Sequence, residues 1–305
     1  MSTLVIVSFL KYHMLKRIGY PVLSRKTGLT TNRTFRLSSA SPEKINETIA
    51  GNLSDLEEIL KYNAGRGWRL FRVGSSVIPF ASHPINTVSW RTEFATKLSE
   101  IGKYVKKTGL RLSMHPGQYT VLNSPKPTVV SNALKELEYS SQFLDAMNLG
   151  KSHKIVIHLG GVFGDKEKST IRLIEQITSL NNRVHERLVI ENDEVNYSPV
   201  DALRVAAATG IPVVFDNLHY SINPGNGPLE DILGQVFSTW SKQDGLPKVH
   251  FSSQAVGSRP GKHAEMANKK EFDLWIRRWS AIGDFDLMVE AKAKDIALDH
   301  LDIHL

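Results

Sequence analysis

Eight short apolar runs, each followed by a longer amphipathic segment, set the strongest constraint on how this chain can fold. The runs are rich in Val, Ile and Leu and occupy residues 18–22, 69–73, 110–114, 155–159, 188–191, 213–216, 248–251 and 287–291. Runs of this length and composition are typical of buried β-strands. Strands that alternate with helices form parallel sheets, because a parallel neighbour needs a crossover connection. The pattern therefore predicts an α/β fold.

The segments between these runs carry the signals of helix ends. Ser41-Pro42 and Ser198-Pro199 each place an N-capping serine before a proline at the first helical position. Gly109 follows another segment, at a position where glycine commonly ends a helix. We expect helices over residues 42–62, 90–107, 128–148, 171–184, 199–209, 229–240 and 271–282.

Eight strand and helix units in a chain of 305 residues favour a single-domain (β/α)8 TIM barrel. An open, doubly wound sheet is the alternative, but no Gly-rich phosphate-binding motif follows the first strand. We expect residues 17–305 to form the barrel domain and residues 1–16 to be an N-terminal extension. The apolar stretch 4–10 in this extension is short and lacks the basic region of a signal peptide.

The charge of the chain and its lack of cysteine narrow its chemistry. Lys and Arg number 38 against 31 Asp and Glu, so the formal net charge is +7 and favours a polyanionic partner. Without cysteine, the chain has no disulfide, no thiolate metal ligand and no cysteine nucleophile. No stretch approaches the roughly 20 apolar residues of a membrane-spanning helix. We therefore expect a soluble, cytoplasmic protein without a membrane partner.

Ionisable side chains gather at the carboxyl ends of the predicted strands, which form the mouth of a TIM barrel, where active sites lie. Taken singly, a histidine here is more often a hydrogen-bonded structural residue than a ligand. Strands three to eight nevertheless each deliver such a group at the same end, which independent accidents would not produce. The cluster comprises histidines and carboxylates: His83, His115, His158, Glu191, Asp216, His219, His250, His263 and Glu290. This set exceeds the roughly four to six ligands of one ion, so we expect two or three divalent ions.

The donor types and one lysine add detail to this expected metal site. Imidazole and carboxylate without thiolate suit Mn, Zn, Co or Fe, and clustered ions suit phosphoryl chemistry. Lys248 precedes His250 by two residues in one strand, so both side chains should point into the barrel. Because ions would repel an ammonium group, we hypothesise that carbon dioxide carboxylates Lys248 into an anionic ligand. A lysine kept neutral by a lowered pKa, or one that reaches the mouth and binds phosphate, is the alternative.

Many stretches of the chain, in order from about residue 18 to 294, together resemble the UV damage endonuclease family. They are IGYP, TTNRTFRL, FRVGSSVIPFASHP, LRLSMHPGQY, KIVIHLGG, LVIENDE, VVFDNLHY, PKVHFSSQ, RPGKHAE and LMVEAKAK. The resemblance implies an endonuclease IV-like TIM barrel and a multi-metal, usually manganese-associated nuclease. It further implies a nick immediately 5′ of UV photoproducts, both cyclobutane pyrimidine dimers and 6-4 photoproducts. The nick would leave a 3′-hydroxyl and a 5′-phosphate.

The resemblance also assigns roles to individual residues. The metal positions of the family fall on the nine residues gathered above, and its modified lysine falls on Lys248. From these positions we assign catalytic roles to Lys248, Glu191 and His250. The damage-probing positions of the family fall on Tyr20, Gln118 and Tyr119.

Further contacts to DNA are expected from polar and basic residues elsewhere in the matched stretches. The candidates are Asn32, Arg33, Arg259 and Lys262, for each of which an ordinary solvated surface position is the alternative. Ser24 stands where relatives often carry Asn, and its shorter side chain should weaken that contact. The implied partner is UV-damaged double-stranded DNA, bound by a monomer that is nucleoid-associated when it acts. Manganese is the expected metal, with Zn, Co or Mg as alternatives.

Three other functions compete with this prediction. An abasic-site endonuclease would share the fold and the metals, and nicking of abasic against UV-irradiated duplexes would separate the two. Metal-dependent sugar isomerases also place His, Glu and Asp at barrel strand ends, but the Gln118-Tyr119 loop and the +7 charge disfavour one. A damage-binding module without catalysis would have no use for a complete set of metal ligands.

Overall fold

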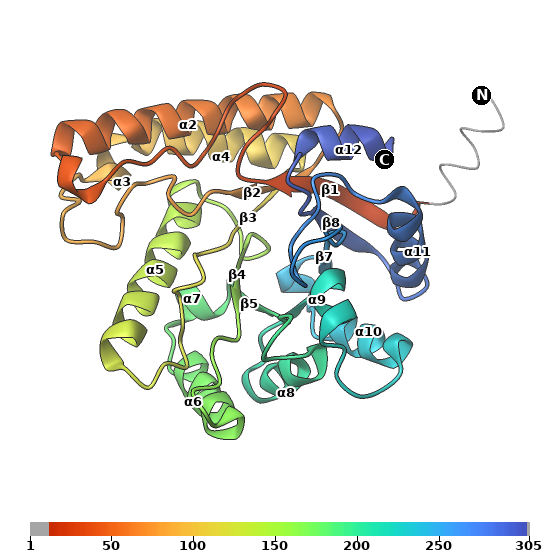
Figure 1. Cartoon of the computed structure of the whole chain (residues 1–305). Coiled ribbons are helices and arrows are strands. Elements are labelled where there is room, and N and C mark those ends of the chain that lie inside the picture. Colours follow the sequence, from red (N-terminus) through yellow and green to blue (C-terminus); the bar gives the residue numbers. More distant parts are fainter. Residues whose placement is uncertain (1–11, 304–305) are drawn as a thin grey trace, which may run out of the picture.

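The computed structural model describes residues 12–303, which form a closed parallel barrel. Consecutive strands pair around the ring, and the last strand pairs with the first (Figure 1). The strands are β1 (Leu15–Pro21), β2 (Leu70–Val73), β3 (Arg111–Met114), β4 (Lys154–His158), β5 (Leu188–Glu191), β6 (Val213–Asp216), β7 (Lys248–Phe251) and β8 (Phe285–Val289). The prediction of a (β/α)8 TIM barrel is therefore confirmed.

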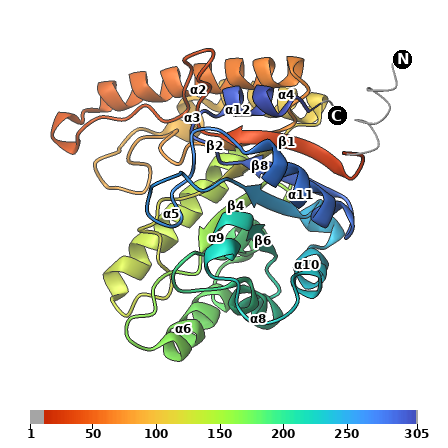
Figure 2. The same ribbon diagram turned by 45° about the vertical axis from the view of Figure 1, so that its right-hand side comes forward.

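Helices connect the strands and surround the barrel, as Figures 1 and 2 show from two sides. They are α2 (Pro42–Gly65), α3 (Trp90–Glu93), α4 (Ala95–Thr108), α5 (Pro127–Ala146), α6 (Lys166–Thr178), α7 (Asn182–His185), α8 (Pro199–Thr209), α9 (Asn217–Ile222), α10 (Leu229–Ser238), α11 (Lys269–Ser280) and α12 (Asp295–Leu301). Short 3-10 turns, Leu37–Ser39 and Lys242–Asp244, precede α2 and β7. The expected capping holds, since the Ser198 side chain accepts a hydrogen bond from the Asp201 backbone N–H at the start of α8.

The structure differs from the sequence-based prediction at several element ends. β1 begins at Leu15, inside the stretch 1–16 that we expected to be an extension, and residues 1–11 lie outside the described part of the chain. The single helix expected over 171–184 is two helices, because Asp165 caps the start of α6 and Asn181 caps α7. The single helix expected over 90–107 is also divided, at Phe94, into α3 and α4.

Two helices escaped the prediction altogether. In α9 the chain turns directly from β6 into a helix, and the Asp216 side chain caps it by accepting a hydrogen bond of 2.9 Å from the His219 backbone N–H. In α12 the residue before the helix is Lys294, with φ 57°, so no capping signal precedes it. Neither helix reaches the length of an ordinary amphipathic pattern, which explains why periodicity did not reveal them.

The interior of the barrel is lined with charge, whereas branched apolar residues usually fill such interiors. Val156, Val189 and Val214 form a separate apolar cluster with Trp240. By strand alternation these valines share a face with His158, Glu191 and Asp216 above them. The apolar layer thus separates a charged group at the carboxyl ends of the strands from a second charged group at their amino ends.

The second charged group is centred on Asp286, which is fully buried. Arg111 donates to its Oδ2 at 2.8 Å, and Arg17 donates to both carboxylate oxygens at 3.2 and 3.3 Å. Arg111 also donates to the Leu246 and Asp244 carbonyls at 2.6 and 2.7 Å. Asp286 therefore joins β8 to β1 and β3, and Arg111 extends this link to the segment that leads into β7.

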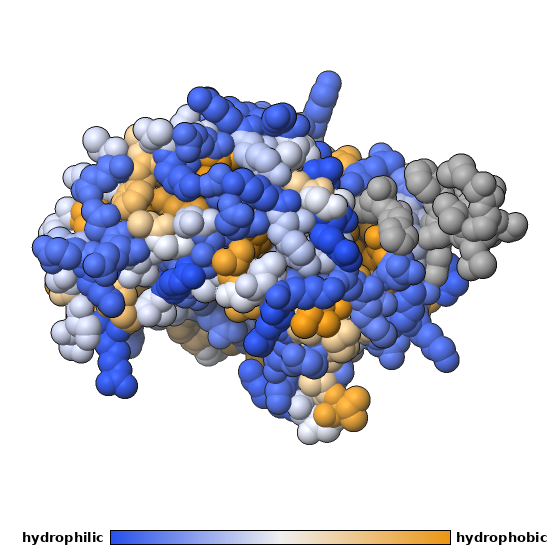
Figure 3. Space-filling view, turned by 90° about the horizontal axis from the view of Figure 1, so that it is seen from above, coloured by the Kyte–Doolittle hydropathy of each residue, from blue (hydrophilic) through white to orange (hydrophobic). Residues whose placement is uncertain are grey.

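The character of the surface is shown by one face of the molecule and by the composition of its helices. Figure 3, seen from above relative to Figure 1, shows a face covered mainly by hydrophilic side chains, with small separate apolar patches. Among the helices of the described residues, none combines the length and the apolar character needed to cross a membrane.

We expect replacement of Asp286 by alanine to destabilise the barrel by about 3–5 kcal/mol, because the buried guanidinium of Arg111 would keep its charge without a carboxylate partner. The matched control is Asp284→Ala, two residues earlier, where Asp284 pairs with Lys16 at the surface at 3.1 Å. An exposed pair of this kind contributes about 0–1 kcal/mol. Urea unfolding of both variants measures the difference, and equal losses of stability would show that the Asp286 network is not structural.

Candidate metal centre

The predicted ligands converge because parallel strands of a closed barrel all end at one mouth. His158, Glu191 and Asp216 are the last residues of β4, β5 and β6. His115 directly follows β3, and Glu290 directly follows β8. Two further histidines come from β7 and α9, namely His250 and His219. Strand alternation points each strand residue inward, and the cap on α9 returns His219 to the same mouth.

Glu191 is the residue that these ligands share. It belongs to three groups of side chains, and the potential ligand atoms of each group lie within 4.8 Å of one another. The groups are His115, His158 and Glu191; Glu191, His250 and Glu290; and Glu191, Asp216 and His219. Each of the three groups could hold a metal ion, and all of them would use Glu191.

The distances around Glu191 show how tightly the cluster is packed. The Nδ1 of His250 lies 2.7 Å from Oε1 of Glu191, and the Nε2 of His115 lies 3.2 Å from Oε2. The ring of His158 lies 5.1 Å from that of His115 and 5.6 Å from that of His219. Successive imidazoles therefore follow the rim of the mouth from β3 to α9.

Backbone carbonyls fix the orientation of three of these imidazoles. The Nδ1 atoms of His115, His219 and His263 lie 3.1, 2.9 and 2.9 Å from the carbonyl oxygens of Pro116, Asn192 and Glu290, respectively. When such a ring is neutral and donates from Nδ1, its Nε2 lone pair is available to a ligand. Support of this kind from outside the coordination sphere is usual for metal-binding histidines. Against the effect of burial, Asp216 and Glu191 raise the pKa of His219 to about 9, so a cation bound there would displace a proton.

The electrostatics of the cluster suit cations. Burial opposes ionisation of Glu191, but His250 and the hydrogen bonds from His115 and His250 hold its pKa well below the usual value. Burial lowers the pKa of His158 to about 4, so this ring is neutral and able to ligate. Burial raises the pKa of Asp216, which an adjacent cation would oppose.

Two orphaned atoms test whether metal ions fit the site. Oδ2 of Asp216 and Nδ1 of His158 are both buried, and neither has a hydrogen-bond partner. A buried polar atom without a partner costs free energy, and in native proteins such atoms call for a ligand, water or ion. Imidazole and carboxylate donors are the ligands that Mn, Zn and Co accept. The residues present therefore fit a cluster of divalent ions.

Two of the nine predicted ligands stand apart from these groups. His263 lies at the edge, with its ring 6.3 Å from that of His219 and its Nδ1 3.8 Å from Oε2 of Glu290. His83 is exposed in the loop after β2, and its Nδ1 accepts a hydrogen bond from the Ile85 backbone N–H at 3.1 Å. Within the described residues, the structure thus brings seven predicted ligands together, places His263 beside them and leaves His83 outside.

Lys248 lies below His250 in β7, and its side chain is buried. Burial lowers its pKa well below the usual value, and the nearby Arg111 and Arg72 lower it further. Burial and these two charges therefore disfavour the ammonium form of Lys248, and carboxylation would begin from the neutral amine.

Arg72 is a residue of the centre that sequence reasoning missed. It lies in β2, buried, with its Nη2 2.9 Å from Nε2 of His250 and 2.5 Å from Oε1 of Glu290. Its guanidinium supplies a fixed positive charge beside the carboxylates, and it lowers the pKa of Glu290 against the effect of burial. The sequence held one signal of this residue, since Arg72 interrupts the otherwise apolar residues of β2.

The loop after β3 carries the predicted damage-probing pair in an exposed position. Gln118 and Tyr119 lie at the tip of a turn, and the Tyr119 side chain is 74% exposed. A Cβ on Gly117 would lie 2.5 Å from the Tyr119 ring, so glycine is needed for the ring to fold back over the turn. Both side chains are free to meet a partner that approaches the barrel mouth.

Of the other predicted DNA contacts, Tyr20 is buried, whereas Asn32 and Arg33 are exposed but already contact other residues of the protein. Tyr20 is fully buried under α2, where its hydroxyl donates to Oδ1 of Asn63 at 2.8 Å, so as placed it cannot reach DNA. Arg33 pairs with Asp55 at 2.6 Å. Asn32 accepts a hydrogen bond from the Ser76 backbone N–H at 3.1 Å.

Arg259 and Lys262, in contrast, lie beside the cluster. They line a pocket of about 710 Å³ together with His263, Glu290 and two further lysines, Lys292 and Lys294. This pocket places positive charge next to the candidate ligands, where a phosphate group would be attracted.

The fold and this site define a TIM-barrel protein with a candidate multi-metal centre at the mouth of the barrel. The chain belongs to the UV-endonuclease family, since residues 8–305 match the family described as UV-endonuclease UvdE. Membership in this family makes it a UV-damage endonuclease, a hydrolase that acts on DNA.

Individual relatives agree with this assignment. The chain is 40% identical over 285 residues to a UV DNA damage endonuclease of Clostridium perfringens, with 92% of this chain and 68% of the relative covered. The crystal structure of SacUVDE is similar with a TM-score of 0.88 at 37% identity, covering 94% of this chain and 99% of that one. Endonuclease IV from Thermus thermophilus has a TM-score of 0.59 at 16% identity, with 94% and 97% covered, and shares the fold.

We expect Glu191→Ala to weaken manganese binding by more than the roughly tenfold that loss of an outer-shell partner costs, because all three groups lose a ligand. Glu186→Ala is the control, since Glu186 pairs with Lys151 away from the mouth. Inductively coupled plasma mass spectrometry after gel filtration gives the manganese bound per chain. Unchanged metal content in Glu191→Ala would contradict a centre built around this carboxylate.

Proposed function

We propose that this protein nicks DNA in a metal-dependent reaction immediately 5′ of UV photoproducts. The substrates are cyclobutane pyrimidine dimers and 6-4 photoproducts in double-stranded DNA, and the products carry a 3′-hydroxyl and a 5′-phosphate. The observation that carries the proposal is the Glu191-centred cluster of imidazoles and carboxylates at the mouth of a UV-endonuclease family barrel. Seven candidate ligands at one mouth suit the hydrolysis of a phosphodiester better than binding alone.

Two or three divalent ions, with manganese as the proposed metal and Zn, Co or Mg as alternatives, would be held by the three groups that share Glu191. When bound, such ions activate water and stabilise negative charge on the attacking and leaving oxygens. Glu191 and His250 keep the ligand shell in place, and the carbonyl contacts of His115 and His219 stop these rings from turning. We extend the ligand set to His263, and to His83 if its loop closes over the DNA.

The basic residues beside the cluster would position the DNA backbone. Arg259, Lys262 and Lys292 line the pocket next to Glu290 and His263. Phosphate contacts of this kind fix the register of a duplex without reading its sequence. They would hold one strand so that the phosphodiester lies over the cluster.

Recognition of the lesion would fall to Gln118 and Tyr119. A photoproduct stacks and pairs poorly, so moving it out of the helix costs less than moving an intact base. The exposed phenol of Tyr119 could stack on the bases left behind, and stacking on aromatic rings is tolerant of sequence. Because Gln118 and Tyr119 follow His115 by only a few residues, lesion binding and cleavage would share one rigid support.

We also propose that Lys248 is carboxylated. The neutral amine would attack carbon dioxide, form a carbamate and release one proton. The resulting negative charge would face Arg111 and Arg72, which now disfavour the ammonium form. Charge balance thus favours the modified side chain in a buried position where the cation is disfavoured.

For this activity we propose a monomer that acts in the cytoplasm on nucleoid DNA. The division into a barrel over 17–305 and an extension over 1–16 is likewise kept as a proposal. The family match favours UV photoproducts over abasic sites and over sugar isomerisation, because the likeness to endonuclease IV, at 16% identity, concerns the fold alone.

A duplex with one defined photoproduct tests the function directly. With manganese we expect a single nick 5′ of the lesion, no nick after EDTA, and recovery when manganese is restored. Glu191→Ala and His250→Ala should abolish nicking and affect DNA binding less. Tyr119→Ala should lower the preference for damaged over intact duplex by about 1–3 kcal/mol, whereas Ile171→Ala on the outer helix α6 should not. Preferential nicking of an abasic duplex, or full activity in EDTA, would refute the proposal.

Carboxylation of Lys248 is open to a spectroscopic test. In protein incubated with ¹³C-bicarbonate we expect a carbamate resonance that Lys248→Met lacks. Lys154→Met is the matched control, because Lys154 is also buried but donates to Oδ1 of Asp244. A wild-type spectrum without this resonance, together with full activity, would show that the lysine acts unmodified.

A further inference from the structure

A second candidate binding site lies at the end of the barrel opposite the metal centre. The pocket has a volume of about 790 Å³ and is lined by Arg17 of β1 and by the segments that lead into β3, β4 and β7. A strand of five residues such as β4 separates the two ends by roughly 13 Å at about 3.3 Å per residue. The volume is within the usual range for pockets that hold small molecules, about 300–1,000 Å³.

The lining of this pocket has only one sign of charge. Five cationic side chains face it, and none of its lining residues is a carboxylate. They are Arg17, Lys106, Arg111, Lys151 and Lys242. A concave surface lined by one sign of charge concentrates counter-ions of the opposite sign.

Nearby carboxylates offset only part of this charge. Arg17 and Arg111 share one partner, Asp286, so this trio keeps a positive charge. Lys151 is balanced by Glu186 at 3.3 Å. The charge of Lys154, which lies behind the pocket, is likewise balanced, because its Nζ lies 2.5 Å from Oδ1 of Asp244.

Lys106 and Lys242 add two further charges at the opening. Lys106 donates to the Asn148 carbonyl at 3.3 Å, and in the described part of the chain neither lysine forms an ion pair with a carboxylate. Together with the surplus on the arginines, the pocket therefore carries about three uncompensated positive charges. Lys106 belongs to α4 and Lys242 to the 3-10 turn before β7, so the two charges come from separate elements of the pocket lining.

His153 reports the same positive environment from within the pocket. Burial and then the charges of Arg111, Arg187 and Arg17 lower its pKa to about 3, so the ring is neutral. Its Nδ1 accepts a hydrogen bond from the Leu112 backbone N–H at 2.9 Å, which leaves the proton on Nε2. The ring thus offers a donor to an anion and adds no charge of its own.

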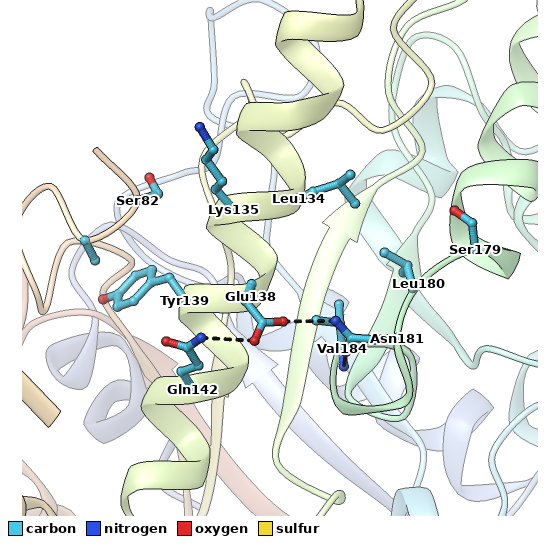
Figure 4. Close-up of a pocket in the computed structure, with 11 residues that line it drawn as sticks. Ser82, Leu134, Lys135, Glu138, Tyr139, Gln142, Ser179, Leu180, Asn181 and Val184 are labelled. Carbon is cyan, nitrogen blue, oxygen red and sulfur yellow. Dashed lines mark hydrogen bonds between the residues drawn. The ribbon is translucent and has the colours of Figure 1, made fainter. Parts of the chain in front are cut away.

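Another surface pocket of the protein serves as a comparison for the charge of this lining. It has a volume of about 600 Å³ and lies between α5 and the turn into α7 (Figure 4). Glu138 there accepts hydrogen bonds from Gln142 and Asn181 at 3.0 and 3.2 Å, which Figure 4 marks, and it pairs with Arg183. Lys135 and Glu138 are the charged residues of its lining, one of each sign, so this pocket lacks the surplus of positive charge that would attract an anion.

We propose that the pocket at the amino ends of the strands binds the diphosphate group of a small molecule. A diphosphate carries about the charge that Lys106, Lys242 and the Asp286 trio leave uncompensated, and its oxygens suit lysine, arginine and imidazole donors. Trp240, Leu246 and Pro247 add an apolar wall, which would receive an organic group attached to the diphosphate. The site is separate from the DNA-cleaving centre and does not depend on the proposed reaction.

Equilibrium dialysis of trace radiolabelled ADP against the manganese-loaded protein tests the site. The nucleotide is kept far below the protein concentration, so that it cannot remove metal ions. We expect Lys106→Gln/Lys242→Gln to weaken binding by at least about tenfold, since two charge-assisted hydrogen bonds are lost. Neither lysine belongs to the cleavage machinery, so unchanged nicking of damaged DNA would confirm that the double variant is folded.

Two controls decide between this pocket and other sources of binding. Lys44→Gln/Lys168→Gln removes the same net charge from exposed helix positions and should leave ADP binding unchanged. Glu191→Ala, which disrupts the metal centre, should also still bind ADP. The proposal is overturned if the wild type at millimolar protein concentration retains no trace ADP, if the control pair weakens binding equally, or if Glu191→Ala alone abolishes it.

Discussion

The arrangement at the mouth of this barrel depends on the buried carboxylate of Glu191. It is enclosed by the ends of the strands, it is shared by three groups of potential ligands, and it contacts His250 and His115 directly. An ionised carboxylate in such a place is unfavourable unless positive charge surrounds it. The histidines, Arg72 and the expected ions each meet part of this requirement.

The same requirement shapes the rest of the barrel interior. Apolar valines occupy one layer only, and charged networks lie on both sides of it. Arg111 and Asp286 join strands at the amino ends of the barrel strands, where Arg111 donates to a backbone carbonyl and to the Asp286 carboxylate. At the open end the corresponding groups retain unpaired atoms, such as Oδ2 of Asp216. The unpaired atoms at the mouth suit metal ions, whereas the Asp286 network holds the strands together and still leaves a surplus positive charge beside the pocket at the amino ends.

The alternation of apolar runs and amphipathic segments was enough to predict the barrel and the end at which its ligands gather. Histidines and carboxylates at strand ends are placed by topology, which explains why seven of them converge as predicted. His83 and Tyr20 show the limit of this reasoning. His83 lies in a long irregular loop, and hydrophobic periodicity does not predict the path of such a loop. The face on which Tyr20 lies is set by how β1 packs on α2. Arg72 was missed because the sequence alone does not show whether an arginine in a strand is exposed or is buried beside a carboxylate such as Glu290.

The most direct test of Glu191 as the shared ligand is anomalous diffraction at the manganese absorption edge from crystals grown with manganese. Two or three anomalous peaks are predicted around Glu191, each within coordination distance of its carboxylate or of a histidine from the three groups. Peaks that leave Glu191 outside every coordination sphere, or a mouth without any peak, would contradict the central role of this carboxylate.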